Sequence, residues 1–466
     1  MAISHRENYI GEFDDPRLDK RAMQLSSMMF FAETVSIHEM SRTEAEQKGA
    51  YRFLANKKVE EKILINAVKH RSGYLCAGRD VLVIQDTTEI NVDNHRGRLK
   101  RGTGIGLTGN NKDLGFFMHG SIVLDGADES RLGFSDIQLW HRAENKKNKK
   151  ERNYPSLPIA EKESKKWLDA CKDGKEHLEE ARTITFIEDR EGDIYEQFAT
   201  IPDERTHLVI RSCRDRKLDD GSMLYAKLAG QPPAGEYEIA LVKDIRKGGV
   251  ESRKATVEVR YCRVSITKPK KVKARPGFPQ TVEVYAVEVK EKNVPPGCDG
   301  VIWRILTTHE VTCYEDALGV IRKYRIRWYI EQLFRLLKEK GFRIEASELE
   351  TGWAIRKLAV MALNAALRVM QLLLARNNEN SQPVEDAFDE GEIACLEALN
   401  KTLQGDTEKS KNRHNPKLLS WAAWIIARLG GWKNYNSKRP PGPVLLKKGL
   451  DKFNSIYQGW NMARAS

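Results

Sequence analysis

Three acidic residues stand where carboxylates could do chemistry together. Asp86 follows a short apolar run at residues 81–84, and Asp189 follows a second run at residues 184–187. Both runs are short and rich in β-branched residues, which indicates buried strands. Acidic residues just past the ends of central strands can meet at the mouth of a sheet. An aspartate in such a place is more often a turn residue or a helix cap, so the prediction depends on the third residue, Glu331.

Glu331 lies in a helix expected over about residues 314–340. When that helix is stepped at ~100° per residue, four residues share an arc of ~60°: Tyr324, Arg327, Glu331 and Lys338. Ile326, Ile330, Leu333 and Leu337 fall on another arc and form the expected buried stripe. A solvated face with an Arg327–Glu331 pair worth a few tenths of a kcal/mol is the alternative. It does not explain why a tyrosine and a late lysine keep the same face.

The four residues match the signature Y-x2-R-x3-E-x6-K, and the chain resembles the bacterial cut-and-paste DDE transposases of the insertion-sequence-four family. Further matches occur in the same order along nearly the whole chain, at residues 49–53, 86–88, 189–194 and 426–431. The resemblance implies that Asp86, Asp189 and Glu331 are catalytic and bind two Mg²⁺ ions, with Mn²⁺ able to substitute. Two metals can stabilise both the attacking and the leaving oxygen at phosphorus, and Mg²⁺ prefers carboxylate oxygens.

The resemblance also implies a set of DNA contacts. Tyr324, Arg327 and Lys338 would hold phosphates of the element end. Trp303 would stack on a flipped base, worth ~1–3 kcal/mol, with core packing as the alternative. The other implied DNA-binding residues are a clamp residue, Arg211, and three candidates for reading the element end, Arg17, Arg21 and Arg52. Arginine can read guanine edges, although phosphate contact is its commoner role.

A reaction and an assembly follow from the same resemblance. One strand is nicked by water, the freed 3′ hydroxyl forms a hairpin with the other strand, water reopens it, and the 3′ hydroxyl joins target DNA. The expected partners are the terminal inverted repeats of the element, target DNA and a second copy of the chain, which forms a homodimer on DNA through C-terminal helices.

The elements that must position these residues predict an α/β protein. The resemblance implies a ribonuclease H-like core, with Asp86 on its first strand, Asp189 after its fourth and Glu331 on a later helix. Five segments are expected: an N-terminal helical end-recognition domain at 1–65, the first part of the catalytic core at 66–212, a β-rich insertion at 213–300, the second part of the core at 301–376, and a C-terminal helical dimerisation domain at 384–466.

Local patterns support this division. A helix is expected to start at residues 14–17 with Pro16 in its first turn, and a capping-box pattern stands at residues 41–44. Gly430 and Gly431 are expected to close a helix that begins at residue 421. Further strands are expected at residues 120–124, 134–140, 207–211, 257–261, 282–284 and 301–306, a helix at 159–180, a polar loop at 146–150, a basic turn at 268–275 and a linker at 377–383.

Composition limits the class of protein. The 466 residues are 40% hydrophobic and 31% charged, with no ~20-residue apolar span and no signal-peptide core. We therefore expect a cytoplasmic, bacterial protein without a membrane, associated with the nucleoid when bound to DNA. The net charge of +12 favours nucleic acid as a partner, with a solubilising surface as the alternative. Seven scattered cysteines without a C-x-x-C pair argue against disulfides or a zinc site.

One glycine-rich motif could suggest a nucleotide-binding site. Residues 104–109 read G-x-G-x-x-G, but the dinucleotide motif must open a helix, and the residues that follow predict a loop and a strand. No nucleotide cofactor is expected.

Two other functions are alternatives to a transposase. A ribonuclease H-like DNA nuclease would use the same carboxylates, yet it needs no end-recognition or dimerisation domain. A catalytically decayed DNA-binding relative is disfavoured because Asp86, Asp189 and Glu331 are intact.

Overall fold

The computed structural model describes residues 7–143, 157–241, 253–269, 277–339, 341–376, 382–433 and 441–465. The chain divides into two compact units. The first comprises Met1–Ala77, Thr87–Lys146 and Ile330–Ser466, and the second comprises Gly78–Asp86 and Lys147–Tyr329. Each unit is described by itself. The features predicted at 146–150, 270–275 and 377–381 lie outside the described residues.

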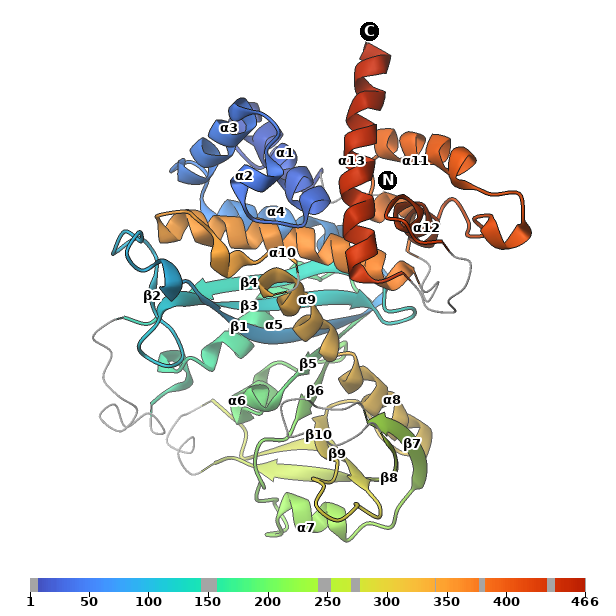
Figure 1. Cartoon of the computed structure of the whole chain (residues 1–466). Coiled ribbons are helices and arrows are strands. Elements are labelled where there is room, and N and C mark those ends of the chain that lie inside the picture. The colour runs from blue at the N-terminus through green and yellow to red at the C-terminus, as the bar shows by residue number, and fades with distance from the viewer. Residues whose placement is uncertain are drawn as a thin grey trace. The chain divides into compact units, whose positions relative to one another are not determined.

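Four helices open the first unit (Figure 1). They are α1 (Pro16–Ala32), α2 (Ile37–Met40), α3 (Glu44–Ala55) and α4 (Glu61–Leu75). The predicted start of α1 is confirmed, because the Asp15 carboxylate accepts the backbone N–H of Arg17 at 3.0 Å. The cap of α3 is Thr43, whose hydroxyl accepts the N–H of Glu46 at 3.2 Å. The predicted boundary at residue 65 falls inside α4.

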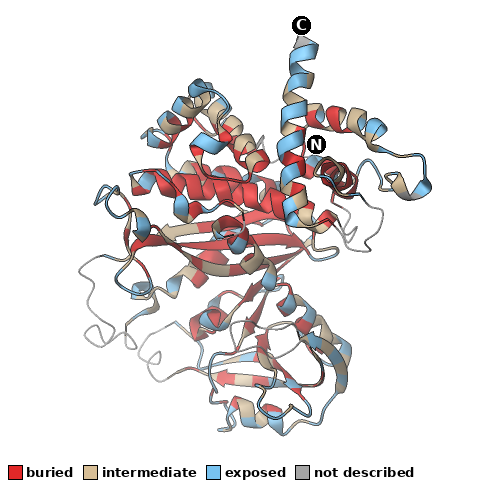
Figure 2. Ribbon diagram, viewed as in Figure 1, coloured by how far each residue is buried: buried red, intermediate tan, exposed pale blue. Residues whose placement is uncertain are grey.

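The core of the first unit is a buried helix on a buried strand pair. All residues of β3 (Leu114–Asp125) are buried, and β3 pairs antiparallel with β4 (Arg131–Trp140) and with the short β2 (Gly106–Leu107). Helix α10 (Gly352–Ala375) contacts β4. It is long and apolar enough to cross a membrane, but 89% of its most apolar window is buried inside the protein (Figure 2). Residues 104–109 form β2 and turns, not a helix start.

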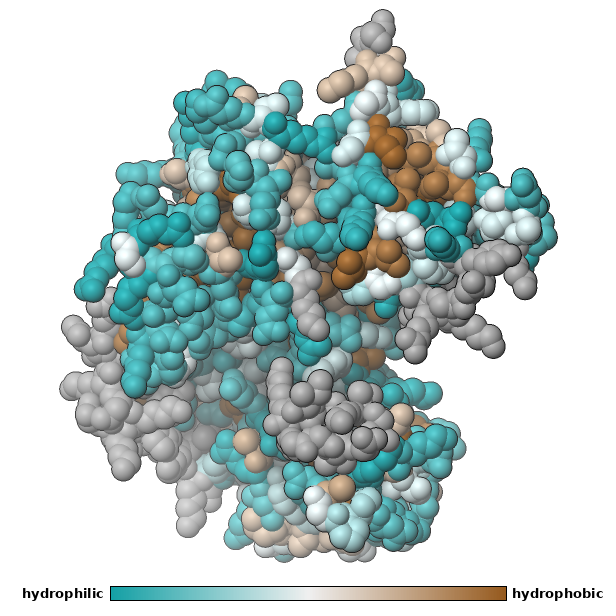
Figure 3. Space-filling model, in the orientation of Figure 1, coloured by the Kyte–Doolittle hydropathy of each residue, from teal (hydrophilic) through white to brown (hydrophobic). Residues whose placement is uncertain are grey.

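The C-terminal part of the first unit is helical, as predicted. It contains α11 (Glu390–Leu403), α12 (Leu419–Leu429) and α13 (Pro443–Ala465). Helix α12 ends at Gly430, and Gly431 takes the left-handed conformation at φ 98° that glycine adopts readily. Hydrophobic residues gather at the surface where α12 and α13 lie in the view of Figure 3, which otherwise shows a mainly hydrophilic face.

The second unit is built on one mixed sheet with the strand order β1-β5-β6-β10-β9-β8-β7. The strands are β1 (Asp80–Asn91, which continues into the first unit), β5 (Thr183–Glu188), β6 (Thr206–Arg211), β7 (Gly235–Leu241), β8 (Arg253–Thr267), β9 (Thr281–Glu291) and β10 (Ile302–Thr307). β1, β5 and β6 are parallel, and β10 runs antiparallel to β6 and β9. The predicted β-rich insertion, β7 to β9, therefore continues this sheet.

Four helices accompany the sheet of the second unit. They are α5 (Lys165–His177), α6 (Tyr195–Thr200), α7 (Leu224–Ala229) and α8 (Tyr314–Arg325). Helix α5 is shorter than the helix predicted over 159–180, which begins as a separate 3₁₀ turn at Ile159–Glu161. Helix α8 contacts β5, β6, β8, β9 and β10.

Two local predictions about the site elements were wrong. The strand expected to end at Asp86 continues to Asn91, because Thr87, Thr88 and Ile90 are themselves strand-forming residues. The helix expected over 314–340 is two helices, α8 and α9 (Trp328–Lys338). Between them the backbone makes i→i+3 hydrogen bonds, from Arg327 N–H to Tyr324 and from Tyr329 N–H to Ile326, so one helical wheel does not describe both sides of the break.

Candidate active site

Asp86 and Asp189 lie at matching positions of two neighbouring parallel strands. The last paired residues of β1 and β5 are Ile84 and Ile187, and each aspartate stands two residues further along its strand direction. Alternation along a strand therefore places both side chains on the face of Ile84 and Ile187. Both aspartates are half-buried. The structure thus brings these two predicted site residues together.

Asp189 stands before the 3₁₀ turn η5 (Arg190–Gly192) but does not cap it with its side chain. Its carboxylate instead faces Tyr324, whose hydroxyl lies 3.5 Å from Oδ1. Tyr324 is only 6% exposed, so it does not lie on a solvated face, which was the alternative interpretation of this helix. Burial raises the pKa of Tyr324, and the Asp189 carboxylate adds to this, while Arg327 and Arg211 act in the opposite direction.

Arg327 is the ion-pair partner of Asp86. Its Nη1 lies 2.9 Å from Oδ2 of Asp86, and the two side chains are 11% and 23% exposed. A guanidinium at this distance makes a charge-assisted hydrogen bond. The break between α8 and α9 falls at Ile326 and Arg327, two residues that local propensity allows in a helix. We attribute the break to this ion pair and to the burial of Ile326.

Trp303 and Arg211 lie beside Tyr324. Trp303, on β10, has its ring centroid 6.3 Å from that of Tyr324 with the planes inclined by 59°, and it is half-buried. Arg211, at the end of β6, is close enough to act on the Tyr324 hydroxyl. Trp328, the first residue of α9, is 49% exposed and follows Arg327 directly. Trp303 and Arg211 are therefore neighbours of Tyr324.

Glu331 and Lys338 belong to the first unit. Glu331 is a half-buried residue in the first turn of α9, a helix that begins in the second unit. The apolar stripe predicted for this segment is buried, with Ile330, Leu333 and Leu337 at 0% exposure. The Lys338 ammonium is 3.0 Å from Oε1 of Glu345, and the same oxygen accepts the N–H of Asn91 at 2.9 Å. Sequence reasoning missed Glu345, which has no motif of its own.

The donor set suits a hard divalent cation. Asp86 and Asp189 offer carboxylate oxygens with partial access to water, which are the ligands that Mg²⁺ prefers. Arg327 competes for one oxygen of Asp86. Within the part of the chain that the structure describes, no group of three or more His, Cys, Asp or Glu side chains gathers around one point that could hold a metal.

The three predicted end-reading arginines lie on helices of the first unit. Arg17 and Arg52 are exposed, and Arg17 pairs with Asp15 at 2.9 Å. The Arg21 guanidinium donates to Oε1 of Gln24 at 2.8 Å and lies against Gly49, where it occupies the place that a Cβ would take.

Two buried acids beside Asp189 were not predicted. Asp193 accepts hydrogen bonds from the Arg216 guanidinium and from the N–H of Cys213 at 2.7 Å, so it ties the end of the η5 loop to the chain beyond β6. Glu188 is fully buried, and burial raises its pKa to about 8 against the lowering effect of hydrogen bonds from Cys171 and Gln197. The run of four acids over residues 188–193 was the only available sequence signal.

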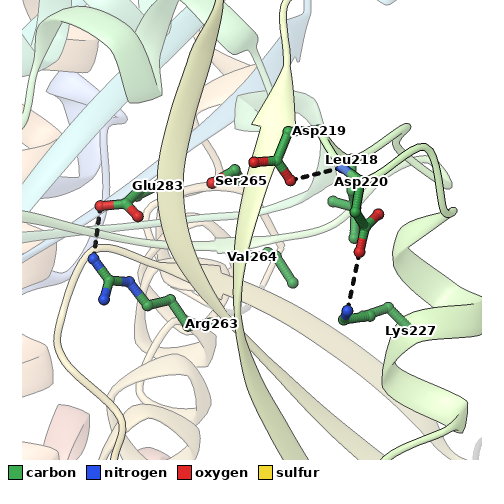
Figure 4. Close-up of a pocket in the computed structure, with 8 residues that line it drawn as sticks. All are labelled: Leu218, Asp219, Asp220, Lys227, Arg263, Val264, Ser265 and Glu283. Carbon is green, nitrogen blue, oxygen red and sulfur yellow. Dashed lines mark hydrogen bonds and ion pairs between the residues drawn. The ribbon is translucent and has the colours of Figure 1, made fainter.

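A cleft of the second unit lies elsewhere, between β8, β9 and α7 (Figure 4). It has a volume of about 260 Å³. Four of its five charged side chains form ion pairs: Asp220 with Lys227 at 3.0 Å and Arg263 with Glu283 at 2.7 Å. Exposed pairs of this kind contribute little energy, and none of the predicted site residues lines the cleft.

Two comparisons with known proteins bear on the chain. Residues 4–59 match the family of transposase DNA-binding segments. A cryo-EM structure of a piggyBac transposase synaptic complex with hairpin DNA aligns with 94% of this chain and 77% of its own at 8% sequence identity, with a TM-score of 0.37, too low to establish a common fold. The family match supports a DNA-binding N-terminal segment of the transposase type.

Proposed function

We propose that this chain is a DNA transposase of the DDE cut-and-paste type, with Asp86, Asp189 and Glu331 as its catalytic carboxylates. One observation carries the proposal. Two aspartates stand at one register of parallel strands, and two members of the four-residue signature contact them: Arg327 contacts Asp86, and Tyr324 contacts Asp189.

The strand pairings support a ribonuclease H-like core. Apart from the two-residue β2, the strands follow in chain order as β1, β3, β4, β5 and β6. In the first unit β4 pairs with β3, and in the second unit β1 pairs with β5 and β5 pairs with β6. Asp86 is on the first of these five strands and Asp189 directly follows the fourth. Both positions agree with what the resemblance implies for this core.

Asp86 and Asp189, with Glu331, would hold two Mg²⁺ ions. When bound, the ions supply electrostatic stabilisation of the attacking and leaving oxygens in an in-line displacement at phosphorus. Arg327 and Lys338 are cations suited to phosphate oxygens. The proposed sequence is a hydrolytic nick at the element end, attack of the freed 3′ hydroxyl on the opposite strand, hydrolysis of the resulting hairpin, and joining to target DNA.

Two surfaces of the first unit fit the proposed partners. The match over residues 4–59 supports α1 to α3 as the helices that bind the element end. Helix α13 carries exposed apolar side chains, with Val444 at 69%, Ile456 at 38% and Met462 at 73% exposure. Exposed apolar groups on one helix favour a protein partner, and we propose the second subunit of a homodimer.

The test uses purified full-length protein and a plasmid that carries the gene with its native flanking DNA. We expect Mg²⁺-dependent release of a linear fragment bounded by inverted repeats. Asp86→Ala, Asp189→Ala and Glu331→Ala should each abolish release while binding to the repeats survives. Unchanged release by any one variant would remove that residue from the site.

A ribonuclease H-like nuclease is the rival function that these carboxylates also fit. The products separate the two. A transposase yields hairpin ends and joins the released fragment to a second plasmid, whereas a nuclease yields open ends and no joined product. Cleavage at random positions without any joining would reject the transposase.

A further inference from the structure

The residues directly before the two aspartates form a second, buried site on the opposite face of the same strands. Gln85 precedes Asp86, and Glu188 precedes Asp189. Both are 0% exposed. Because side chains alternate along a strand, Gln85 and Glu188 point away from the face that carries the aspartates. Both therefore lie in the interior of the second unit, beneath the candidate active site.

A cysteine joins the two strands there. Cys171, from α5, has its Sγ 3.4 Å from Nε2 of Gln85 on β1 and 3.3 Å from Oε1 of Glu188 on β5. Gln197, from α6, donates from Nε2 to Oε1 of Glu188, and this Nε2 is 3.5 Å from the same sulfur. The thiol is thus the centre of a network of four buried side chains.

The loop that bears Asp189 rests on this network. A Cβ at Gly192 would overlap the Glu188 carboxyl group, so η5 can lie this close only because residue 192 is glycine. The second oxygen of Glu188, Oε2, is buried and has no hydrogen-bond partner among the described residues. The position of the Glu188 side chain therefore determines how closely the Asp189 loop approaches β5.

We propose that Gln85, Cys171, Glu188 and Gln197 form a positioning network that sets the spacing between the Asp86 and Asp189 carboxylates. Hydrogen bonds among buried side chains restrict the positions of those side chains, and catalytic groups need placement to within ~0.5 Å. Cys171 and Glu188 are positioning residues in this network, since neither faces the site. The inference rests on the proposed function of Asp86 and Asp189.

The test compares divalent metal binding and cleavage across variants of the full-length protein. Glu188→Met and Cys171→Val keep the approximate volume but remove the hydrogen bonds. Losing a group that orients a metal ligand weakens metal binding by about 10- to 100-fold. We expect that loss in Mn²⁺ titrations of the DNA-free protein followed by electron paramagnetic resonance. An equal rise is expected in the Mg²⁺ concentration for half-maximal cleavage, with binding to the inverted repeats unchanged.

A matched control separates positioning from stability. Glu291 is a buried acid of the same unit, 5% exposed and bound to Arg253, with no contact to the network. Glu291→Met should lower thermal stability without changing the Mn²⁺ affinity. Glu188→Gln and Cys171→Ser, which keep hydrogen-bonding groups and are small changes, should restore Mn²⁺ affinity to within about threefold of wild type, a difference below ~1 kcal/mol.

Three outcomes decide the question. If Glu188→Met and Cys171→Val lose stability but bind Mn²⁺ as Glu291→Met does, the network is only structural and the proposal fails. If those two variants do not fold, the milder variants Glu188→Gln and Cys171→Ser test the proposal, because it requires both of them to bind Mn²⁺ more tightly than the Asp189→Asn variant does. If Asp86→Asn and Asp189→Asn bind and cleave normally, the proposed function itself is wrong.

Discussion

The two faces of the β1–β5 strand pair carry acidic side chains in opposite environments. On one face Asp86 and Asp189 are half-buried and meet a guanidinium and a phenol. On the other face Gln85 and Glu188 are fully buried and meet a thiol and an amide. Adjacent residues of one strand therefore place one acid near water and cations and the next acid away from both.

The two faces of one strand pair can therefore serve separate functions, one in binding cations and the other in positioning side chains. An ionised carboxylate is stable where water or a cation reaches it, and burial without a cation favours the neutral acid. Asp86 has Arg327 as its counter-ion, whereas Glu188 has only neutral partners among those the structure shows, and burial raises its pKa to about 8. The half-buried acids are suited to bind cations, and the buried acid is suited to keep its neighbouring side chains in one position.

Replacing a carboxyl group by an amide on each face should give the largest difference in cleavage rate. Asp189→Asn should lower cleavage of the element end by on the order of 10²–10³-fold or more, as the loss of one electrostatic group does in other active sites. Glu188→Gln keeps a neutral side chain of the same shape and should change the cleavage rate by less than about threefold, which is under ~1 kcal/mol. The measurement is the single-turnover cleavage rate. Equal losses in both variants would mean that the two faces are not functionally distinct.

The loop that links the two faces should be the most sensitive to a loss of charge pairing. Asp193 is 0% exposed in its side chain and pairs with Arg216, which is 5% exposed. Asp193→Ala leaves a buried guanidinium without this partner and should cost about 3–5 kcal/mol. Urea unfolding measures this loss of unfolding free energy. Asp219→Asn, in the surface cleft, is the control. A loss below ~1 kcal/mol would show that water reaches Arg216.

The buried face should also contribute to the pH dependence of stability. The folded pKa of Glu188 is about 8, and that of an unfolded glutamate is about 4.3. Between these values the unfolded state releases the proton while the folded state keeps it, so this residue makes unfolding easier as the pH rises. Glu188→Gln should flatten the fall in unfolding free energy over this range. An unchanged pH profile in urea titrations would place the Glu188 carboxyl in contact with water.

The exposed face should give the smallest effect on stability. Arg327→Gln breaks a partly exposed ion pair with Asp86 and should cost less than ~1 kcal/mol. Its effect on DNA should be clearer, because removing one phosphate contact reduces the salt dependence of binding by about one unit of slope. Fluorescence anisotropy with the inverted repeat at several salt concentrations measures it. Arg263→Gln, in the surface cleft of Figure 4, is the control with an unchanged slope.

Local sequence patterns predicted the elements that depend on neighbouring residues. The apolar runs before Asp86 and Asp189, the helix start with Pro16 in its first turn and the helix end at Gly430 are all found in the structure. The insertion strands β8 and β9 were also predicted, but β7 and the continuity of these strands with the core sheet were not, because that continuity depends on pairing between β10 and β6, which are distant in the chain. The domain boundaries, Glu331 as a third ligand and the metal ions remain predictions.

Residue types and their spacing identify which residues could do the chemistry: two aspartates after apolar runs and a spaced set of tyrosine, arginine, glutamate and lysine. The contacts among these residues depend on the folded chain. The tertiary structure broke the predicted helix at Ile326 and Arg327, turned the Tyr324 hydroxyl toward Asp189, and paired Arg327 with Asp86. It also separated Glu188 from Asp189 by burial. Strand alternation is local, but which face is buried depends on α5 and α6 packing against it, and no local pattern encodes that.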